Sequence, residues 1–123
     1  MKITLLAEDA IRLEQTGGPM TIEAATADQL YSPFHMLASG LAFCTHSVLS
    51  SWASHAKMDA GDLVTEVRWA FAEQPHRVGS IDVKIIWPSL PEARIAAAGR
   101  TAALCAIHAT LTQSPTITAT VER

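Results

Sequence analysis

The sequence predicts an α+β fold in which two long helices pack on an antiparallel sheet. Three observations lead to this prediction: short alternating runs near the N-terminus, a hairpin pattern in mid-chain, and long helical segments that follow Pro33 and Pro91. The elements run strand, strand, strand, helix, strand, strand, helix, strand (βββ-α-ββ-α-β). Because no linker, repeat or low-complexity tract interrupts the 123 residues, we expect residues 1–123 to form a single domain.

The first three strands are short and are separated by turns. Alternation of apolar and polar residues predicts strands at residues 2–8, 10–16 and 20–24. Gly17 and Gly18 suit the turn before the third strand, because glycine readily adopts positive φ. Three strands joined in this way predict an antiparallel meander.

The first helix is predicted to begin at Pro33 and to run to about Lys57, with no proline to interrupt it. Ser32 supplies an N-cap oxygen, and proline suits the first helical position, where a backbone N–H lacks a partner. One stripe of the helical wheel is apolar: Phe34, Leu37, Leu41, Thr45, Val48 and Trp52. Polar residues lie opposite this stripe: His35, Ser39, His46, Ser50 and Lys57. Cys44 lies at the edge of the stripe, beside the small residues Gly40, Ser47 and Ser51.

A hairpin, a second helix and a last strand complete the predicted fold. Pro91 lies near the first position of an alanine-rich helix that runs to about Leu111 and carries Cys105 on its flank. Alternating residues predict three further strands, at residues 63–71, 79–87 and 116–121.

The composition bears on the partners of the chain. Apolar residues make up 49% of the sequence and charged residues only 17%, which is lean in charge for the surface of a small monomer. We therefore expect a partner subunit to cover part of the surface. A formal net charge of −3 with scattered basic residues argues against nucleic-acid binding. The longest uncharged run is broken by proline, serine and histidine, so we expect no membrane partner.

The N-terminus resembles the start of a signal peptide, but its apolar run stops at Glu8 and is too short for one. We therefore expect a cytoplasmic protein. In a reducing compartment, two cysteines are more often free, catalytic or redox-active than joined in a structural disulfide.

Cys44 and Cys105 are the residues best suited to chemistry, and their residue pattern leaves two interpretations open. Each lies on a helix face lined by small residues, and two such faces can pack closely enough to bring the sulfurs within disulfide reach. The pair would then act in redox chemistry, with one thiolate oxidised and the other thiol resolving it as a disulfide. Alternatively, they are two unrelated buried cysteines that act as small hydrophobes.

His108 follows Cys105 by three residues, which places an imidazole and a thiol on one helix face. It could lower the thiol pKa, act as a base, or bind a metal together with Cys44. A tetrahedral metal site needs further ligands, whereas His35 and His46 point away from Cys44 on the helical wheel. We therefore expect no metal and no cofactor. The simplest interpretation of His108 is a helix residue bonded to a backbone carbonyl.

The two cysteine segments together resemble the OsmC/Ohr family of osmotically inducible and organic-hydroperoxide-resistance proteins. In that family a proline opens a helix that reaches its first cysteine after a Leu/Ala/Gly-rich stretch, here residues 32–44 (SPFHMLASGLAFC). A second cysteine follows on a later helix, here in residues 105–111 (CAIHATL), which are similar to the variant with a histidine after the cysteine. The element order also matches, so the resemblance covers nearly the whole chain.

The resemblance implies an OsmC-like intertwined homodimer with buried long helices and active sites at the subunit interface. It also implies the reduction of organic hydroperoxides in oxidative-stress defence. Carried over, Cys44 is the peroxidatic thiol, and Cys105 resolves its sulfenic acid to a disulfide that a dithiol reductant then reduces. Phe34, Leu37 and Trp52 would line an apolar pocket for the organic part of the substrate.

Departures from the family pattern keep a second function open. Phe34 stands where the hydroperoxide reductases have a glutamate after the helix-opening proline, and Ala106 stands where they have a proline after the second cysteine. The arginine that this glutamate orients over the reactive thiol has no clear match, since Arg12 is the only arginine near the N-terminus. The alternative is a non-catalytic dimeric module on the same fold that binds a small apolar ligand.

Overall fold

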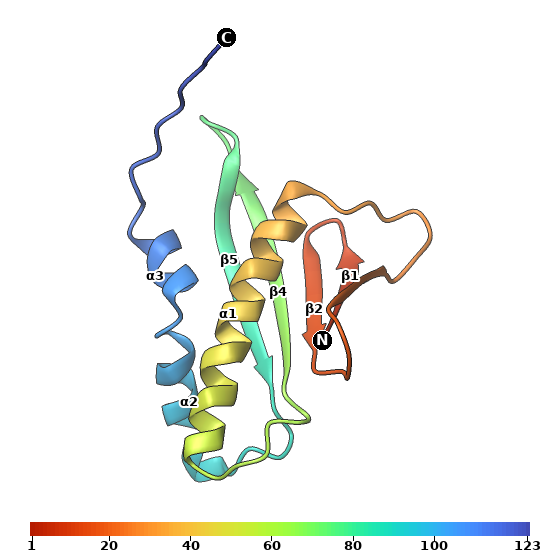
Figure 1. Cartoon of the computed structure of the whole chain (residues 1–123), viewed down its shortest axis with the longest axis vertical. Coiled ribbons are helices and arrows are strands. Elements are labelled where there is room, and N and C mark those ends of the chain that lie inside the picture. Colours follow the sequence, from red (N-terminus) through yellow and green to blue (C-terminus); the bar gives the residue numbers. More distant parts are fainter.

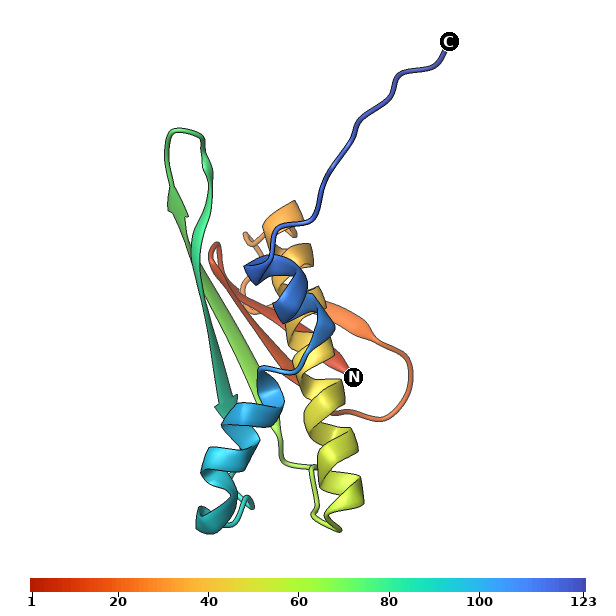
Figure 2. The same cartoon turned by 90° about the vertical axis from the view of Figure 1, so that its left-hand side faces the viewer.

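A computed structural model describes residues 1–123 and shows one sheet with helices on one of its faces (Figure 1; Figure 2). The strands are β1 (Lys2–Ala7), β2 (Ala10–Glu14), β3 (Thr21–Ala24), β4 (Val64–Ala72) and β5 (Arg77–Ile86). The helices are α1 (Pro33–His55), α2 (Ile95–Ala102) and α3 (Ala106–Thr112), with a 3-10 turn at Glu92–Arg94 before α2. The structure confirms the predicted α+β class.

The sheet has the strand order β3-β1-β2-β4-β5, and one pair of its strands is parallel. The β1–β2, β2–β4 and β4–β5 pairs are antiparallel as predicted, but β3 runs parallel to β1, so the predicted meander is wrong at this strand. The reason is that β1 and β4 occupy both edges of β2. The chain instead passes round the start of β1, where the Met1 amine donates to the Thr16 carbonyl and the Thr21 N–H donates to the Met1 carbonyl, both at 3.0 Å.

The face of α1 that packs on the sheet is not the apolar stripe of the helical wheel. It consists of two histidines and mostly small residues: His35, Ala38, Ala42, His46, Leu49 and Ala53. Small side chains let the helix approach the strands closely, and each histidine has a hydrogen-bond partner there. His35 Nε2 lies 2.9 Å from the Ala7 carbonyl oxygen, and His46 Nε2 lies 3.0 Å from Gln15 Oε1. Neither α1 nor any other helix combines the length and hydropathy needed to cross a membrane.

The second long helix is broken into α2 and α3, which corrects the prediction of one helix to about Leu111. Cys105 adopts an extended conformation (φ −61°, ψ 131°) directly before α3. No proline or glycine marks the break. Instead, Cys105 Sγ accepts the N–H of His108 at 3.4 Å, as an N-cap side chain does. The break leaves α2 and α3 both packed against α1.

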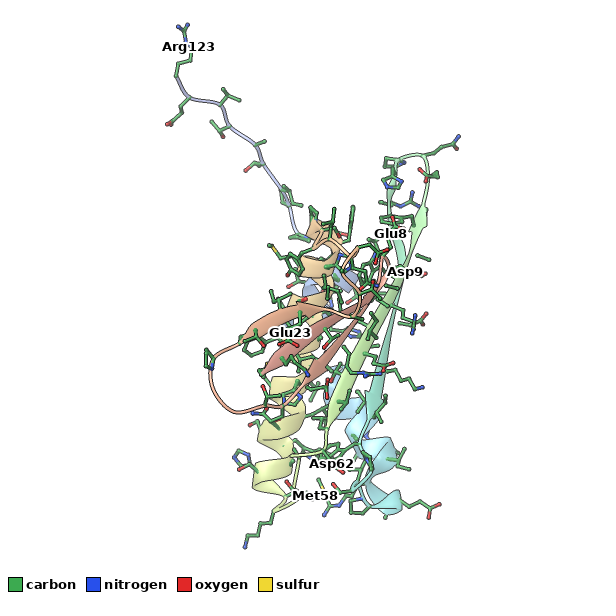
Figure 3. All side chains as sticks on the ribbon, turned by 90° about the vertical axis from the view of Figure 1, so that its right-hand side faces the viewer. Glu8, Asp9, Glu23, Met58, Asp62 and Arg123 are labelled. Atoms are coloured by element: carbon green, nitrogen blue, oxygen red, sulfur yellow. The ribbon has the colours of Figure 1, made fainter.

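The last predicted strand, residues 116–121, pairs with no strand of this chain. It extends beyond the body of the molecule from the end of α3 (Figures 1 and 2), and Ile117 and Val121 are 85% and 92% exposed. Figure 3 shows Arg123 at the tip of this tail, with Met58 and Asp62 at the opposite end of the molecule. The apolar residues of this C-terminal tail therefore have nothing to pack against within the chain.

Candidate thiol site between α1 and α3

The two cysteines reach one place from different kinds of backbone. Cys44 lies in the middle of α1 with its thiol half-buried, whereas Cys105 precedes α3 and is completely buried. Hydrogen bonding between the two thiols lowers the pKa of Cys44 and raises the pKa of Cys105, so the structure brings together the two predicted site residues. Both thiols are free. Near them lie the N–H groups of Ala106 and Ile107, which have no acceptor inside α3 because they belong to its first turn.

Burial and hydrogen bonding act in opposite directions on the pKa of the Cys44 thiol. Burial raises this pKa because it disfavours the thiolate. The Cys105 side chain and the backbone N–H groups of Ile107 and Ala106 donate hydrogen bonds to the Cys44 sulfur, and together they hold its pKa below the ordinary value. No charged side chain contributes to this shift. Neutral donors at the start of α3 therefore stabilise the thiolate, without a neighbouring cation.

Cys105 shifts the other way. Burial raises the pKa of its thiol, and the hydrogen bond to Cys44 and the charge of Cys44 raise it further. The backbone N–H groups of His108 and Ile107 lower this pKa, but the net shift is upward. The proton therefore remains on Cys105 while the negative charge develops on Cys44. This division gives one accessible thiolate beside one buried thiol.

An apolar pocket of about 580 Å³ opens one helical turn from each cysteine. Leu41, three residues before Cys44, and His108, three residues after Cys105, both line it. Its apolar walls come from α1 (Phe34, Leu37 and Leu41), from β5 (Val78, Ile81 and Val83) and from α3 (Leu111). A pocket of this size and character suits a small organic molecule.

Comparison with known proteins identifies the family. The profile of the OsmC-like proteins matches residues 26–120, which is more than half of the chain and includes both cysteines. The chain belongs to the OsmC-like family.

Two solved structures share the OsmC-like fold. A protein described as an osmotic stress induced and detoxification response protein, from Psychrobacter arcticus 273-4, is 24% identical with a TM-score of 0.62, over 68% of this chain and 62% of that one. An OsmC-like hydroperoxide resistance protein from Jannaschia sp. CCS1 is 26% identical with a TM-score of 0.57, over 75% and 67%. The chain thus spans less than two thirds of the first of these proteins. No curated protein sequence matches this chain.

The pocket of this OsmC-like chain contains most of the residues predicted to line it. Phe34 and Leu37 line it, as expected, and so does His108. Trp52 does not, and instead packs edge-on against Trp87 with ring centroids 6.1 Å apart. His35 and His46 lie against the sheet, so neither is turned to the thiols.

The charged pair that the family places over its reactive thiol has no counterpart here. Phe34 packs edge-on against Phe71 with ring centroids 4.8 Å apart. Arg12 alternates with the core residues of β2, and its guanidinium binds Glu66 at 2.7 Å, on the sheet face away from α1. No three His, Cys, Asp or Glu side chains converge to hold a metal ion.

Two features of the site were not predicted from the sequence. The first is the set of backbone donors at Ala106 and Ile107, which exist only because the helix breaks before them. The one local signal for the break is a cysteine that can cap a helix through its sulfur, a weak signal within an alanine-rich run. The second is Arg77, which lines the pocket from β5, although it lies 33 residues from Cys44 along the chain.

Proposed function

We propose that this OsmC-like protein reduces organic hydroperoxides through Cys44 and Cys105, without a cofactor, in cytoplasmic peroxide defence. Membership in the OsmC-like family, and the likeness to a hydroperoxide resistance protein, support a role in peroxide defence in general. The observation that carries the thiol chemistry is the lowered pKa of Cys44 beside a second thiol and an apolar pocket. A two-cysteine peroxidase that acts on organic hydroperoxides uses all three: a thiolate, a resolving thiol and room for the organic group.

The reaction proceeds in two covalent steps and a reductive one. The Cys44 thiolate attacks the terminal oxygen of the hydroperoxide, so that an S–O bond forms while the O–O bond breaks, and the alkoxide takes a proton to leave as an alcohol. The Cys105 sulfur then attacks the Cys44 sulfenic acid, which releases water and forms a disulfide. A dithiol reductant restores both thiols by exchange. Once Cys44 is oxidised, its negative charge no longer raises the pKa of Cys105, which favours the second step.

The same proposal includes a homodimer. Helix α1 carries no Asp, Glu, Lys or Arg along its length, and one of its faces is exposed: Met36, Gly40, Phe43, Ser47 and Ser51. Beside the site, Leu104 is 77% exposed. A second copy that packs on these surfaces would bury them and close the open side of the site. It would also offer a neighbouring strand to the extended tail at residues 116–121.

One observation favours the second candidate, a dimeric module that binds a small apolar ligand without peroxide chemistry. Phe34 and the Arg12–Glu66 pair leave no cation or carboxylate over Cys44. Neutral hydrogen bonds alone must then activate the thiol. The two candidates differ in one property, which is the fate of the Cys44 sulfur in the presence of peroxide.

The deciding experiment is a thiol count by mass spectrometry after brief exposure of the reduced protein to cumene hydroperoxide. We expect a Cys44–Cys105 disulfide in the wild-type protein and none in Cys44→Ala, where Cys105 should stay free because it is buried. In Cys105→Ala, Cys44 should stop at the sulfenic acid, which dimedone traps.

A known thiol peroxidase, treated in parallel, calibrates the peroxide dose. If both thiols stayed free at a dose that oxidises this control protein, the peroxidase proposal would fail. The pocket would then be assigned to ligand binding alone.

A further inference from the structure

Arg77 is the one permanently charged side chain that lines the pocket, and the structure holds it in place. It is the first residue of β5, and its Nη1 donates to the carbonyl oxygens of Glu73 at 3.0 Å and Pro75 at 2.9 Å. These two bonds anchor the guanidinium to the tip of the β4–β5 hairpin. Its Nε–H and Nη2 hydrogens have no protein partner, and no carboxylate forms an ion pair with it.

The pocket around Arg77 is apolar and holds no negative charge. Seven of its 12 lining residues are hydrophobic, and neither aspartate nor glutamate is among the others. An unpaired cation against an apolar wall favours an anion, and the free Nε/Nη2 edge of an arginine matches the two oxygens of a carboxylate. The pocket therefore suits a ligand that is apolar along most of its length and acidic at one end.

Arg77 lies at the end of the pocket far from the thiols. Phe34 packs against Phe71, whose neighbour across the hairpin is Val78, so this end of the pocket adjoins Arg77. The other end is marked by Leu41, next to the turn that carries Cys44. Phe34 and Leu41 are seven residues apart on α1, a distance of about 10 Å along the helix.

We infer that Arg77 is a specificity-determining residue, which selects pocket ligands with a carboxylate at one end of an aliphatic chain. The aliphatic chain of the ligand lies along α1, between the helices and β5, and its carboxylate binds Arg77 at the hairpin. This orientation places the end of the ligand opposite the carboxylate toward Cys44. If the protein acts as the hydroperoxide reductase proposed above, on which this step rests, its preferred substrates carry their acid group at the end away from the O–O bond.

Calorimetric titration with decanoate, below its micelle concentration, and with 1-decanol, below its solubility limit, tests the selection without any peroxide. These probes share an alkyl chain and differ in the head group. We expect the wild-type protein to bind decanoate about five-fold more tightly at low salt, and the preference to shrink as salt screens the exposed guanidinium. Arg77→Gln should remove the preference, and Arg77→Lys should retain part of it because the charge remains.

Arg68→Gln is the matched control, because Arg68 is an exposed arginine of β4 that does not line the pocket. This variant should keep the wild-type preference. Equal binding of the two probes by the wild-type protein would overturn the inference, and so would a preference that survives in Arg77→Gln. Thiol oxidation of the wild-type protein by neutral cumene hydroperoxide is scored separately. Its absence would refute the peroxidase proposal, whatever the two probes show.

Discussion

The unbroken helix α1 and the broken pair α2–α3 each supply one cysteine to the site, but they present it differently. Cys44 lies in mid-helix and is half-buried, one helical turn from Leu41, which lines the pocket. Cys105 lies at the break, is completely buried and caps α3 with its sulfur. The comparison teaches that a break in one helix can activate a thiol on another, because it exposes backbone donors that an intact helix would use internally.

The largest expected effect separates the roles of the two thiols in catalysis. Cys44→Ser should lower the rate of cumene hydroperoxide reduction at least about a thousand-fold, because the nucleophile is lost. Cys105→Ser should still consume one equivalent of peroxide rapidly and then stop, because no disulfide forms. Stopped-flow kinetics with excess peroxide measures both. Multiple turnovers by Cys105→Ser with a dithiol at the wild-type rate would contradict the resolving role.

The next effect concerns the pKa of Cys44. Its thiolate should persist to lower pH than an ordinary cysteine thiolate. The pH midpoint of its alkylation by iodoacetamide should therefore be lower than the midpoint of an unperturbed cysteine. Cys105→Ala removes one of the three hydrogen bonds to the Cys44 sulfur, and the midpoint should move to higher pH. Peptide mapping of the alkylated protein gives the rate for each thiol. An unchanged midpoint in Cys105→Ala would show that the backbone donors alone set this pKa.

A smaller effect concerns stability. Cys105→Ala should cost about 1–2 kcal/mol of the free energy of unfolding, because it removes a helix cap and leaves a small buried void. Cys44→Ala should change this free energy by no more than about 0.5 kcal/mol, because the side chain is half-buried and alanine favours a helix. Urea denaturation at one protein concentration measures both. Equal costs would argue against a capping role for the Cys105 sulfur.

How much of this the sequence predicts depends on whether a signal is local. The start of α1 was predicted correctly because Ser32 and Pro33 determine it within one turn, and the β4–β5 hairpin was predicted because its alternation is long. The direction of β3 was wrong because it depends on which edges of β2 other strands occupy. The break before α3 was missed because alanine-rich sequence suits an intact helix.

The site shows the same limit. Two cysteines on small-residue faces were enough to predict a pair, and Cys44 and Cys105 do meet. Their meeting does not test the redox roles, which stay predictions. The donors that shift the pKa of Cys44, and the presence of Arg77 in the pocket, follow from tertiary packing that no spacing in the sequence encodes.

The smallest expected effect is a change in stability on replacing a helical glycine by alanine, which tests whether a second copy of the protein packs on α1 but not on α2. Gly40 in α1 and Gly99 in α2 are both helical, and a Cβ added at either would meet no atom within 4 Å beyond its chain neighbours and the backbone of its own helix. In an isolated monomer, alanine at either position should therefore stabilise the fold by about 0.5–1 kcal/mol, because glycine costs more conformational entropy.

A second copy packed on the exposed face of α1 breaks this equivalence. Gly40→Ala would then push the two copies apart and shift the mass measured by light scattering toward the monomer, while Gly99→Ala would still stabilise. Unfolding measured over a range of protein concentrations distinguishes the two, because dimer stability depends on concentration. If both variants gained the same stability and kept the same mass, Gly40 would lie outside any interface, and the uncharged length of α1 would need another explanation.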